Sequence, residues 1–375
     1  MRPMYKFFGY IYFMKNSLIV IFILIWIVNC AVDSNPGNEN DPYFPPTVGN
    51  EWESQSLSDL NWDSNKVPTL LNLLEENNTR AFIVLKNGRI VIEEYFGENL
   101  VETEPFTQST NWYWASAGKT LTAFVVGIAQ EEGYLDINDP TYNYLGSGWT
   151  AMSPDQEAQV LVKNQLTMTS GFDDGVPNST NTSPENLVYL APPNTRWAYH
   201  NAPYTLLQSV VNEATNVNFD SYFTPKLKNK IGMDGFWMQL NQNRVYFSTA
   251  RSAARFGHLI LNDGVWDGAR IMNDRTFFDE MITTSQNLNP SYGYLWWLNG
   301  KSSYMIPQVQ QVFQGSLFPN APGDMFCGIG ANGQFVCVVP SLELVMIRMG
   351  AAPDQNEMPF TFLDDIWGVL KEIIR

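Results

Sequence analysis

Strand-forming segments lie at both ends of this chain, and that placement restricts its fold more than any other pattern in the sequence. Residues 80–98 read RAFIVLKNGRIVIEEYFGE, in which two β-rich runs flank Asn87-Gly88, a dipeptide favoured in two-residue hairpin turns. Residues 135–285 show mixed helix and loop patterns. Strand patterns return at 292–300, 324–330, 333–340 and 342–350, and a helical pattern fills 359–374. We therefore predict an α+β fold, with one antiparallel sheet built from both chain ends and flanked by helices, and a mostly helical subdomain inserted over 135–285.

The N-terminal segment has the pattern of an export signal. Residues 18–28, LIVIFILIWIV, form an apolar run of 11 residues. A membrane-spanning helix needs about 20 residues, so this run is too short to be one. It fits the apolar core of a signal peptide, and a start at Met14 would place Lys15 in the basic segment of that signal. Residues 1–30 are therefore predicted to be a signal peptide, and the protein is predicted to be exported.

Cys30 follows the apolar run directly and resembles the lipidated cysteine of a bacterial lipoprotein, although Asn29 stands where that pattern prefers a small residue. Cys30 is thus a candidate for lipidation, and we expect a periplasmic protein or a membrane-anchored lipoprotein of a bacterium. Residues 31–49 contain little that could form a core, which predicts a flexible tether. The folded domain is then expected to cover 50–375.

Composition and charge narrow the possible partners. Hydrophobic residues make up 45% of the chain, which is enough for a large core, and the formal net charge is −16. So acidic a chain is not expected to bind nucleic acid. The chain holds two histidines and no His-Glu-x-x-His pattern, so we expect neither a metal site nor an organic cofactor. Membrane contact is expected only through the N-terminal signal or a lipid anchor.

The two cysteines near the C-terminal end, Cys327 and Cys337, lie symmetrically about Asn332 in a predicted β-hairpin. That register would place them opposite each other, and an oxidising compartment would permit a disulfide. Two free cysteines in the core are the alternative, and the sequence leaves both open.

The stretch WYWASAGKTLTAF, in the first third of the chain, allows more than one kind of chemistry. Its Gly-Lys-Thr run at 118–120 matches the end of a phosphate-binding loop, but that loop needs a glycine where Tyr113 stands. A Gly-x-Ser-x-Gly nucleophile turn also fails, because Trp114 occupies the first glycine position. The pattern that remains is Ser116-x-x-Lys119.

Ser116-x-x-Lys119 opens a predicted amphipathic helix. Ser116 would lie at the helix N-terminus, where backbone N–H groups and the helix dipole favour a developing alkoxide. Lys119, at i+3, would lie on the same face, and burial can lower the pKa of an ammonium group enough to make it a base. A helix-capping serine beside a solvated lysine is the alternative. The apolar residues that define the helix are Leu121, Phe124, Val125, Ile128 and Ala129.

A second motif, Tyr199-x-Asn201 within WAYHN, follows the serine by about 80 residues. Together the two motifs resemble those of the serine β-lactamase and penicillin-binding-protein superfamily, in its class C β-lactamase-like branch of esterases and 6-aminohexanoate-dimer hydrolases. The resemblance covers most of the chain after the signal peptide, and it implies a β-lactamase/transpeptidase-like fold. The similar segments, in order, are YLDINDPTYNYL (134–145), LVKNQLTMTSGF (161–172), PPNTRWAYHNAPYTLLQSVV (192–211), STARSAARFGHLILNDGVWDG (248–268) and GQFVCVVPSLELVMIRMG (333–350).

The resemblance implies a role for each motif residue. Ser116 would be the acylated nucleophile, Lys119 its base or proton relay, and Tyr199 the group that completes proton transfer. Asn201 would position Lys119 or the substrate. The backbone N–H groups of Ser116 and Ala331 would form the oxyanion hole.

The third motif departs from the superfamily's pattern. β-Lactamases and penicillin-binding proteins carry Lys-Thr-Gly or His-Thr-Gly on the strand that lines the site, where this chain has Gly328-Ile329-Gly330. The missing lysine would hold a substrate carboxylate. Its loss disfavours β-lactam hydrolysis and transpeptidation, and it favours neutral esters or amides.

Several residues near the motifs allow a structural interpretation. The tryptophans Trp112, Trp114 and Trp197 fit either an apolar acyl pocket or core packing. The histidines His200 and His258 are expected to be structural or, for His200, to line the pocket.

The leading hypothesis is therefore a serine hydrolase that cleaves a small-molecule ester or amide through an acyl-enzyme on Ser116. One alternative is a D-alanine carboxypeptidase, a D-aminopeptidase or a weak β-lactamase acting on cell-wall-type substrates. A second alternative is a catalytically silent binding module, although the retention of all four motif residues argues against it.

Overall fold

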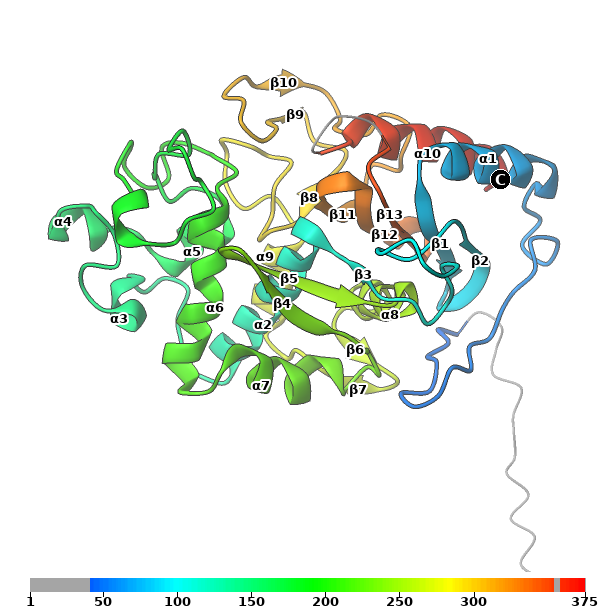
Figure 1. Cartoon of the computed structure of the whole chain (residues 1–375), viewed down its shortest axis with the longest axis horizontal. Coiled ribbons are helices and arrows are strands. Elements are labelled where there is room, and N and C mark those ends of the chain that lie inside the picture. Colours follow the sequence, from blue (N-terminus) through cyan, green and yellow to red (C-terminus); the bar gives the residue numbers. More distant parts are fainter. Residues whose placement is uncertain (1–40, 354–357, 375) are drawn as a thin grey trace, which may run out of the picture. The chain divides into compact units, whose positions relative to one another are not determined.

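Strands from the two ends of the chain pair in one six-stranded antiparallel sheet of order β2-β1-β13-β12-β11-β8 (Figure 1). β1 pairs with β13, and Ile83 lies opposite Ile347 in this pair. The sheet therefore joins segments that are far apart in the sequence, as predicted. Its strands are β1 (Thr79–Lys86), β2 (Arg89–Tyr95), β8 (Trp297–Leu298), β11 (Phe326–Gly330), β12 (Gln334–Val339) and β13 (Leu344–Gly350).

The structure is a computed structural model that describes residues 41–353 and 358–374, and Pro42–Arg375 forms one compact unit. The predicted signal peptide, the lipidation candidate Cys30 and residues 31–40 of the predicted tether lie outside the described residues. Within the part of the chain that the structure describes, no helix is long and apolar enough to cross a membrane.

Local sequence explains two hairpins of this sheet. Asn87 and Gly88 take φ angles of 49° and 83°, and a type I′ turn requires positive φ at both positions. Asn332 and Gly333, with φ angles of 63° and 77°, turn the chain between β11 and β12. Asparagine and glycine are the residues that adopt this region at the least cost.

One face of the sheet carries α1 (Val67–Glu76) and α10 (Phe360–Ile373), which pack against each other (Figure 1). On this face Phe362 of α10 contacts the ring of Phe335 and the guanidinium of Arg348. The sequence predicted α10, and the apolar sides of both helices supply the cover that this face of the sheet requires.

The other face carries α8 (Ala250–Leu261) (Figure 1). Gly257 permits the close contact, since a Cβ atom there would lie 2.5 Å from a methyl carbon of Val345. The prediction of a separate helical subdomain over 135–285 is therefore wrong for this helix, because α8 is part of the layer that covers the main sheet.

A second sheet was not predicted. Its three strands, in the order β3-β5-β4, are β3 (Trp112–Tyr113), β4 (Phe236–Leu240) and β5 (Asn243–Ser248). β4 and β5 form a hairpin around Asn241, which has a φ angle of 55°. β3 joins them from more than 100 residues earlier in the chain, so this sheet too depends on a contact that local sequence does not reveal.

α2 (Lys119–Glu131) is buried on all sides, and each residue from Lys119 to Ala129 is buried. The sequence predicted one buried face, but α6 (Asn201–Thr215) and α9 (Arg275–Met281) cover the remainder. The other helical segments are η1 (Ser64–Lys66), η2 (Ala115–Gly118), α3 (Tyr142–Leu145), α4 (Pro154–Glu157), α5 (Val162–Leu166), η3 (Pro184–Asn186), α7 (Phe219–Phe223), η4 (Thr224–Lys228), η5 (Ala331–Gly333) and η6 (Pro340–Leu342). The short strands are β6 (Val265–Trp266), β7 (Ala269–Arg270), β9 (Ser303–Tyr304) and β10 (Phe313–Gln314).

Residues 42–49, which the sequence placed in the flexible tether, include a segment that packs against α8. The carbonyl oxygen of Tyr43 accepts a hydrogen bond of 2.8 Å from Nε2 of His258. Arg255 donates to the carbonyl oxygens of the two prolines that follow in this segment. The tether prediction is therefore wrong here, because this backbone satisfies buried polar groups of α8.

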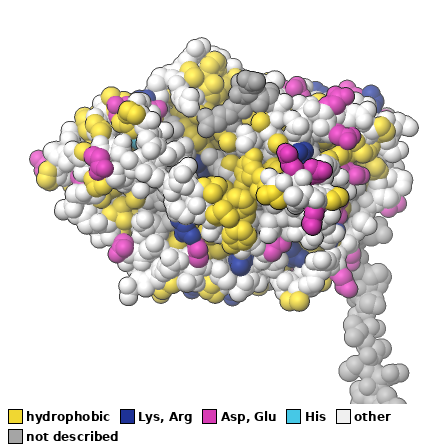
Figure 2. Space-filling model, viewed as in Figure 1, with side chains coloured by type: hydrophobic (Ala, Val, Ile, Leu, Met, Phe, Trp, Pro, Cys, Tyr) yellow, Lys and Arg dark blue, Asp and Glu magenta, His cyan; other side chains and the backbone are white. Residues whose placement is uncertain are grey.

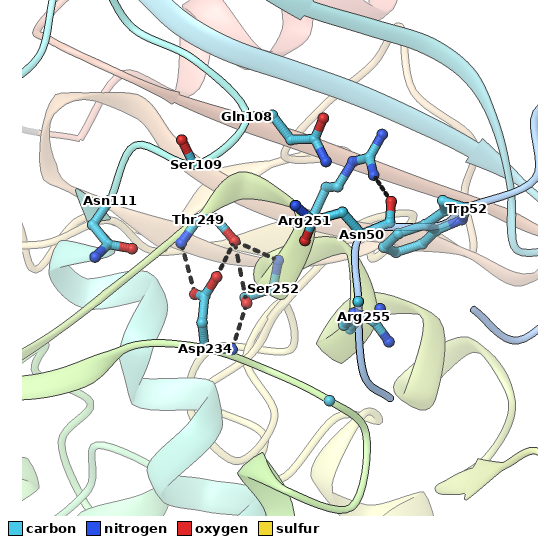
Figure 3. A pocket seen from close by; sticks show the side chains of 12 residues that line it. Asn50, Trp52, Gln108, Ser109, Asn111, Asp234, Thr249, Arg251, Ser252 and Arg255 are labelled. Carbon is cyan, nitrogen blue, oxygen red and sulfur yellow. Dashed lines mark hydrogen bonds between the residues drawn. The ribbon is translucent and has the colours of Figure 1, made fainter. Parts of the chain in front are cut away.

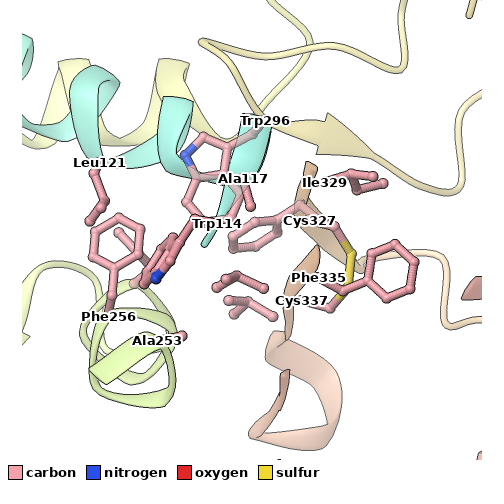
Figure 4. Close-up of a cluster of buried hydrophobic side chains, with 14 of the residues drawn as sticks. Trp114, Ala117, Leu121, Ala253, Phe256, Trp296, Cys327, Ile329, Phe335 and Cys337 are labelled. Carbon is pink, nitrogen blue, oxygen red and sulfur yellow. A yellow bond between two sulfur atoms is a disulfide. The ribbon is translucent and has the colours of Figure 1, made fainter. Parts of the chain in front are cut away.

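Cys327 and Cys337 lie directly opposite each other in β11 and β12 and form a disulfide, with their Cα atoms 4.2 Å apart. Of the two alternatives that the sequence left open, the structure has the bonded one. Figure 4 shows the disulfide beside Phe335, on the face of the sheet that carries α10.

Candidate active site

The candidate nucleophile lies on a tight turn that precedes the helix. β3 leads into the 3-10 turn η2 (Ala115–Gly118), and α2 begins only at Lys119. Ala115 has a φ angle of 47°, in the left-handed region, which costs a residue with a side chain about 1–2 kcal/mol. The ring of Trp114 is buried in the core and fixes the start of the turn (Figure 4). Ser116 is left half-buried and accessible.

Two glycines of β11 allow this strand to approach the turn. A Cβ atom on Gly330 would lie 2.3 Å from the carbonyl oxygen of Trp114 and 3.0 Å from the nitrogen of Ser116. A Cβ atom on Gly328 would lie 3.0 Å from a methyl carbon of α2. The backbones therefore lie closer than a side chain would allow. Ala331, which follows Gly330, is thus brought to the nucleophile end of the strand.

Ile329 does not line the site with its side chain, so that part of the prediction is wrong. Successive side chains of a strand point to opposite faces, and Gly328 and Gly330 face the nucleophile turn. Ile329 is 1% exposed and pairs with Phe335 on the face that carries α10. Figure 4 shows Ile329 and Ala117 on opposite sides of β11.

Lys119 connects the two motifs. Its Nζ donates to Ser116 Oγ at 2.8 Å and to Asn201 Oδ1 at 2.8 Å. The side chain is 2% exposed, and Nζ lies 4.2 Å from the ring centroid of Tyr204 and 5.1 Å from that of Tyr199. Since Lys119 is the first residue of α2 and Asn201 the first of α6, the packing of these two helices sets the position of all three polar groups.

Tyr199 belongs to an aromatic cluster beside Lys119. Its ring stacks on Trp297 at a centroid distance of 5.6 Å and meets Tyr292 edge-on at 6.2 Å. Trp197 packs against the same rings. These contacts hold the Tyr199 ring in place, which a proton-transfer group requires.

The sequence did not single out Tyr204, Tyr292 or Trp297 as site residues. Burial raises the pKa of Tyr204 to about 12. Burial, followed by the nearby Tyr199 and Tyr204, raises the pKa of Tyr292 well above its ordinary value. Both hydroxyls therefore stay protonated at neutral pH. The only sequence signal for Tyr204 was its position near Tyr-x-Asn, at the start of α6.

Neither histidine completes a Ser-His pair in the described residues. Burial lowers the pKa of His200 to about 4, and its ring meets Phe172 edge-on at 6.4 Å. His258 lies on α8, where its ring donates a hydrogen bond to the carbonyl oxygen of Tyr43. Burial lowers the pKa of His258 to about 4 as well, so both rings are neutral at neutral pH.

The tryptophans near the motifs are core residues. Trp112 is 3% exposed and donates to the carbonyl oxygen of Gly350, and Trp114 is 1% exposed. Trp197 is also 1% exposed, and its ring packs against the ring of Tyr199. Core packing, rather than an acyl pocket, explains Trp112 and Trp114.

A separate polar pocket of about 230 Å³ lies between the N-terminal segment, the loop before β3 and α8 (Figure 3). Arg251 donates to both carboxylate oxygens of Glu93 at 2.7 Å and to the carbonyl oxygen of Asn50. Asp234 accepts from the N–H and the hydroxyl of Thr249. Because Arg251 and Asp234 are satisfied within the protein, their role here is structural.

Comparison with known proteins identifies the class to which this fold and site belong. The sequence profile of the family described as Beta-lactamase matches residues 74–359, about three quarters of the chain. The chain therefore belongs to the beta-lactamase family, and the predicted β-lactamase/transpeptidase-like fold is confirmed.

Individual relatives are distant but match over most of their length. The 6-aminohexanoate-dimer hydrolase of Paenarthrobacter ureafaciens is 23% identical over 83% of this chain and 81% of that protein. The structure of a family VIII carboxylesterase has a TM-score of 0.63 and 15% identity, covering 86% of this chain and 99% of the other. The octameric penicillin-binding protein homologue from Pyrococcus abyssi has a TM-score of 0.60 and 15% identity, covering 82% and 77%. The family and these relatives indicate a hydrolase of the β-lactamase superfamily.

Proposed function

We propose that the protein is a serine hydrolase that cleaves a neutral ester or amide bond through an acyl-enzyme on Ser116. The observation that carries this proposal is the position of Lys119 Nζ, 2.8 Å from both Ser116 Oγ and Asn201 Oδ1. A capping serine beside a solvated lysine, the alternative from the sequence, does not fit a lysine that is 2% exposed.

In the first half of the reaction Ser116 Oγ attacks the carbonyl carbon of the substrate, and its proton passes to Lys119 or through it to Tyr199. The carbonyl oxygen becomes an oxyanion that the N–H groups of Ser116 and Ala331 stabilise. Tyr199 then gives a proton to the leaving alcohol or amine as the C–O or C–N bond breaks. The acyl group remains on Ser116 as an ester.

In the second half a water molecule attacks the carbonyl carbon of this ester. Its proton passes back through Tyr199 and Lys119 to Ser116 Oγ as the acyl–oxygen bond breaks. The acid leaves, and the serine hydroxyl is restored.

The preference for neutral substrates follows from the packing of β11. A side chain at Gly328 would begin 3.0 Å from a methyl carbon of Thr120. The lysine of the superfamily's third motif would therefore be tightly packed at this position, and Thr120 would have to shift by a few tenths of an ångström. Relatives described as a carboxylesterase and as an aminohexanoate-dimer hydrolase support ester and amide chemistry equally.

The test is hydrolysis of p-nitrophenyl butyrate and of the matching butyranilide by the wild-type protein, Ser116→Ala and the control Ser109→Ala. Ser109 is exposed and lies in the loop before β3. Loss of the nucleophile is expected to lower kcat/KM by at least about 1,000-fold, whereas Ser109→Ala keeps the wild-type rate. Mass spectrometry of the acid-quenched wild-type protein should find the butyryl group on Ser116.

Turnover that survives in Ser116→Ala would overturn the acyl-enzyme. Stable labelling of Ser116 by a fluorescent penicillin, without turnover of either butyryl substrate, would favour the cell-wall alternative instead. If Ser116 shows neither turnover nor labelling, the binding module is favoured.

A further inference from the structure

One face of the β3-β5-β4 sheet is apolar, and it is exposed along β4. Strand pairing places Tyr113, Phe247 and Phe236 in one row across the three strands, because directly paired residues lie on the same face. The same face continues along the β4–β5 pair with Val245 opposite Met238, and it ends with Leu240 on β4. No charged residue stands at any of these positions.

Large apolar side chains on this face are exposed to solvent, where they add little to the stability of the fold. Phe236, Met238 and Leu240 are 48%, 38% and 42% exposed, and they alternate along one strand. The opposite face is packed normally, with Trp237 only 8% exposed and in contact with α7. Figure 2 shows apolar side chains gathered in the middle of the molecular face where Figure 1 places β3, β4 and β5. An apolar patch of this kind on a soluble domain marks a binding surface.

The row of rings begins beside the candidate active site. Tyr113 precedes Ser116 by three residues, and its hydroxyl accepts a hydrogen bond of 2.9 Å from Asn332, the residue after Ala331. From Tyr113 the ring contacts lead outward to Phe247 at 6.3 Å and on to Phe236 at 5.7 Å. The apolar face is therefore continuous with the two backbone N–H groups assigned to the oxyanion.

The dimensions of the face suit an extended chain. Crossing from β3 to β4 covers two strand spacings, about 10 Å, and running along β4 from Phe236 to Leu240 adds about 13 Å. A surface of this length without charge matches a hydrocarbon chain, and it offers nothing to a charged head group.

We propose that this face binds the hydrocarbon chain of a long-chain acyl substrate whose carbonyl carbon lies at Ser116. The inference rests on the proposed function and specifies its substrate class: esters or amides of long-chain carboxylic acids. The acyl chain leaves the oxyanion site over Tyr113 and lies along Phe236 toward Leu240, while Phe247, which is only 8% exposed, supports the ring of Phe236.

The first test compares kcat/KM for p-nitrophenyl butyrate and p-nitrophenyl dodecanoate, both kept below micelle-forming concentrations. Burial of a methylene group strengthens binding about four-fold, so an open face that covers one side of the chain should contribute roughly two-fold per group. The variants Met238→Ser and Leu240→Ser should lower the dodecanoate-to-butyrate ratio about ten-fold each, mainly through KM. The control Val217→Ser, at an isolated residue that is 41% exposed, should leave the ratio unchanged.

The second test measures binding without catalysis. Ser116→Ala should bind cis-parinaric acid, a fluorescent fatty acid, and addition of Met238→Ser or Leu240→Ser should weaken that binding about ten-fold. If neither the butyrate nor the dodecanoate ester is cleaved but this result holds, the proposed function fails while the chain-binding face stands.

An unchanged dodecanoate-to-butyrate ratio in both β4 variants, together with unchanged cis-parinaric acid binding, would overturn the proposal. Size-exclusion chromatography of the same variants tests whether a second copy of the chain, rather than a hydrocarbon chain, covers this face. A change from dimer to monomer in Met238→Ser without loss of fatty-acid binding would assign the face to contact between two copies of the chain, and that outcome also overturns the proposal.

Discussion

Replacing Gly330 with alanine should displace the nucleophile while the fold is retained. The added Cβ atom would lie 2.3 Å from the carbonyl oxygen of Trp114, 2.9 Å from the nitrogen of Ala117 and 3.0 Å from that of Ser116. All three are backbone atoms, so no side-chain rotation relieves the contact. β11 and the nucleophile turn must move apart by roughly 1 Å to reach ordinary contact distances.

The structure supports an estimate of the effect. A displacement of this size at a catalytic group lowers kcat about 100-fold, and an overpacked core position costs about 1–3 kcal/mol of unfolding free energy. Gly328→Ala should be milder, because the nearest atom to its Cβ would be a methyl carbon of Thr120 at 3.0 Å and the nearest backbone atom would be 3.3 Å away.

Gly368→Ala is the matched control. Gly368 lies inside α10, where the nearest atom to an added Cβ is 3.7 Å away, so the substitution should raise stability by about 0.5–1 kcal/mol. The assays are kcat on p-nitrophenyl butyrate and the free energy of unfolding from urea titration. If Gly330→Ala retained wild-type kcat and stability, β11 would not lie against the turn as described, and the assignment of Ala331 to the oxyanion hole would lose its basis.

Three further predictions concern the rest of the molecule. Acid should destabilise the protein through His258, because burial lowers the pKa of this side chain to about 4. The free energy of unfolding should be fully present above pH 6.5 and fall by about 3 kcal/mol as the pH drops through 4. The urea midpoints at pH 7 and pH 4 should differ less in His258→Gln than in the wild-type protein. Replacing both Cys327 and Cys337 with alanine should lower the free energy of unfolding by about 3 kcal/mol, because the disulfide joins residues 10 positions apart and restricts the unfolded chain. A urea titration that finds no loss of stability would contradict this prediction. Asn201→Ala should lower kcat about 10–100-fold with little change in KM, because the amide orients Lys119, and an effect on KM alone would assign Asn201 to substrate binding.

Elements whose cause is local were predicted correctly. The Asn87-Gly88 hairpin and the helix around Trp367 follow from turn residues and from helical periodicity within a few residues. Elements stabilised by distant partners were missed. β4 and β5 carry no strong pattern of their own, and residues 42–49 look polar and irregular until the buried groups of α8 to which they bond are known.

The candidate site divides in the same way. The motif residues Ser116, Lys119, Tyr199 and Asn201 could be named from the sequence, because a family resemblance is carried by residue type and spacing. The orientation of Ile329 could not, since a one-residue uncertainty in strand register reverses which side chains face the site.

The sequence by itself determined which chemical groups this protein has and the local elements on which they lie: a serine and a lysine one helical turn apart, a tyrosine and an asparagine at the start of another helix, and glycines in the last long hairpin. Only the tertiary structure decided that these groups meet, with Lys119 Nζ 2.8 Å from both Ser116 Oγ and Asn201 Oδ1. It also decided that one face of the β3-β5-β4 sheet is left open beside them. The physical reason is that turns and helix periodicity are set by neighbours along the chain, whereas burial, pKa values and distances between helices depend on residues more than 80 positions apart.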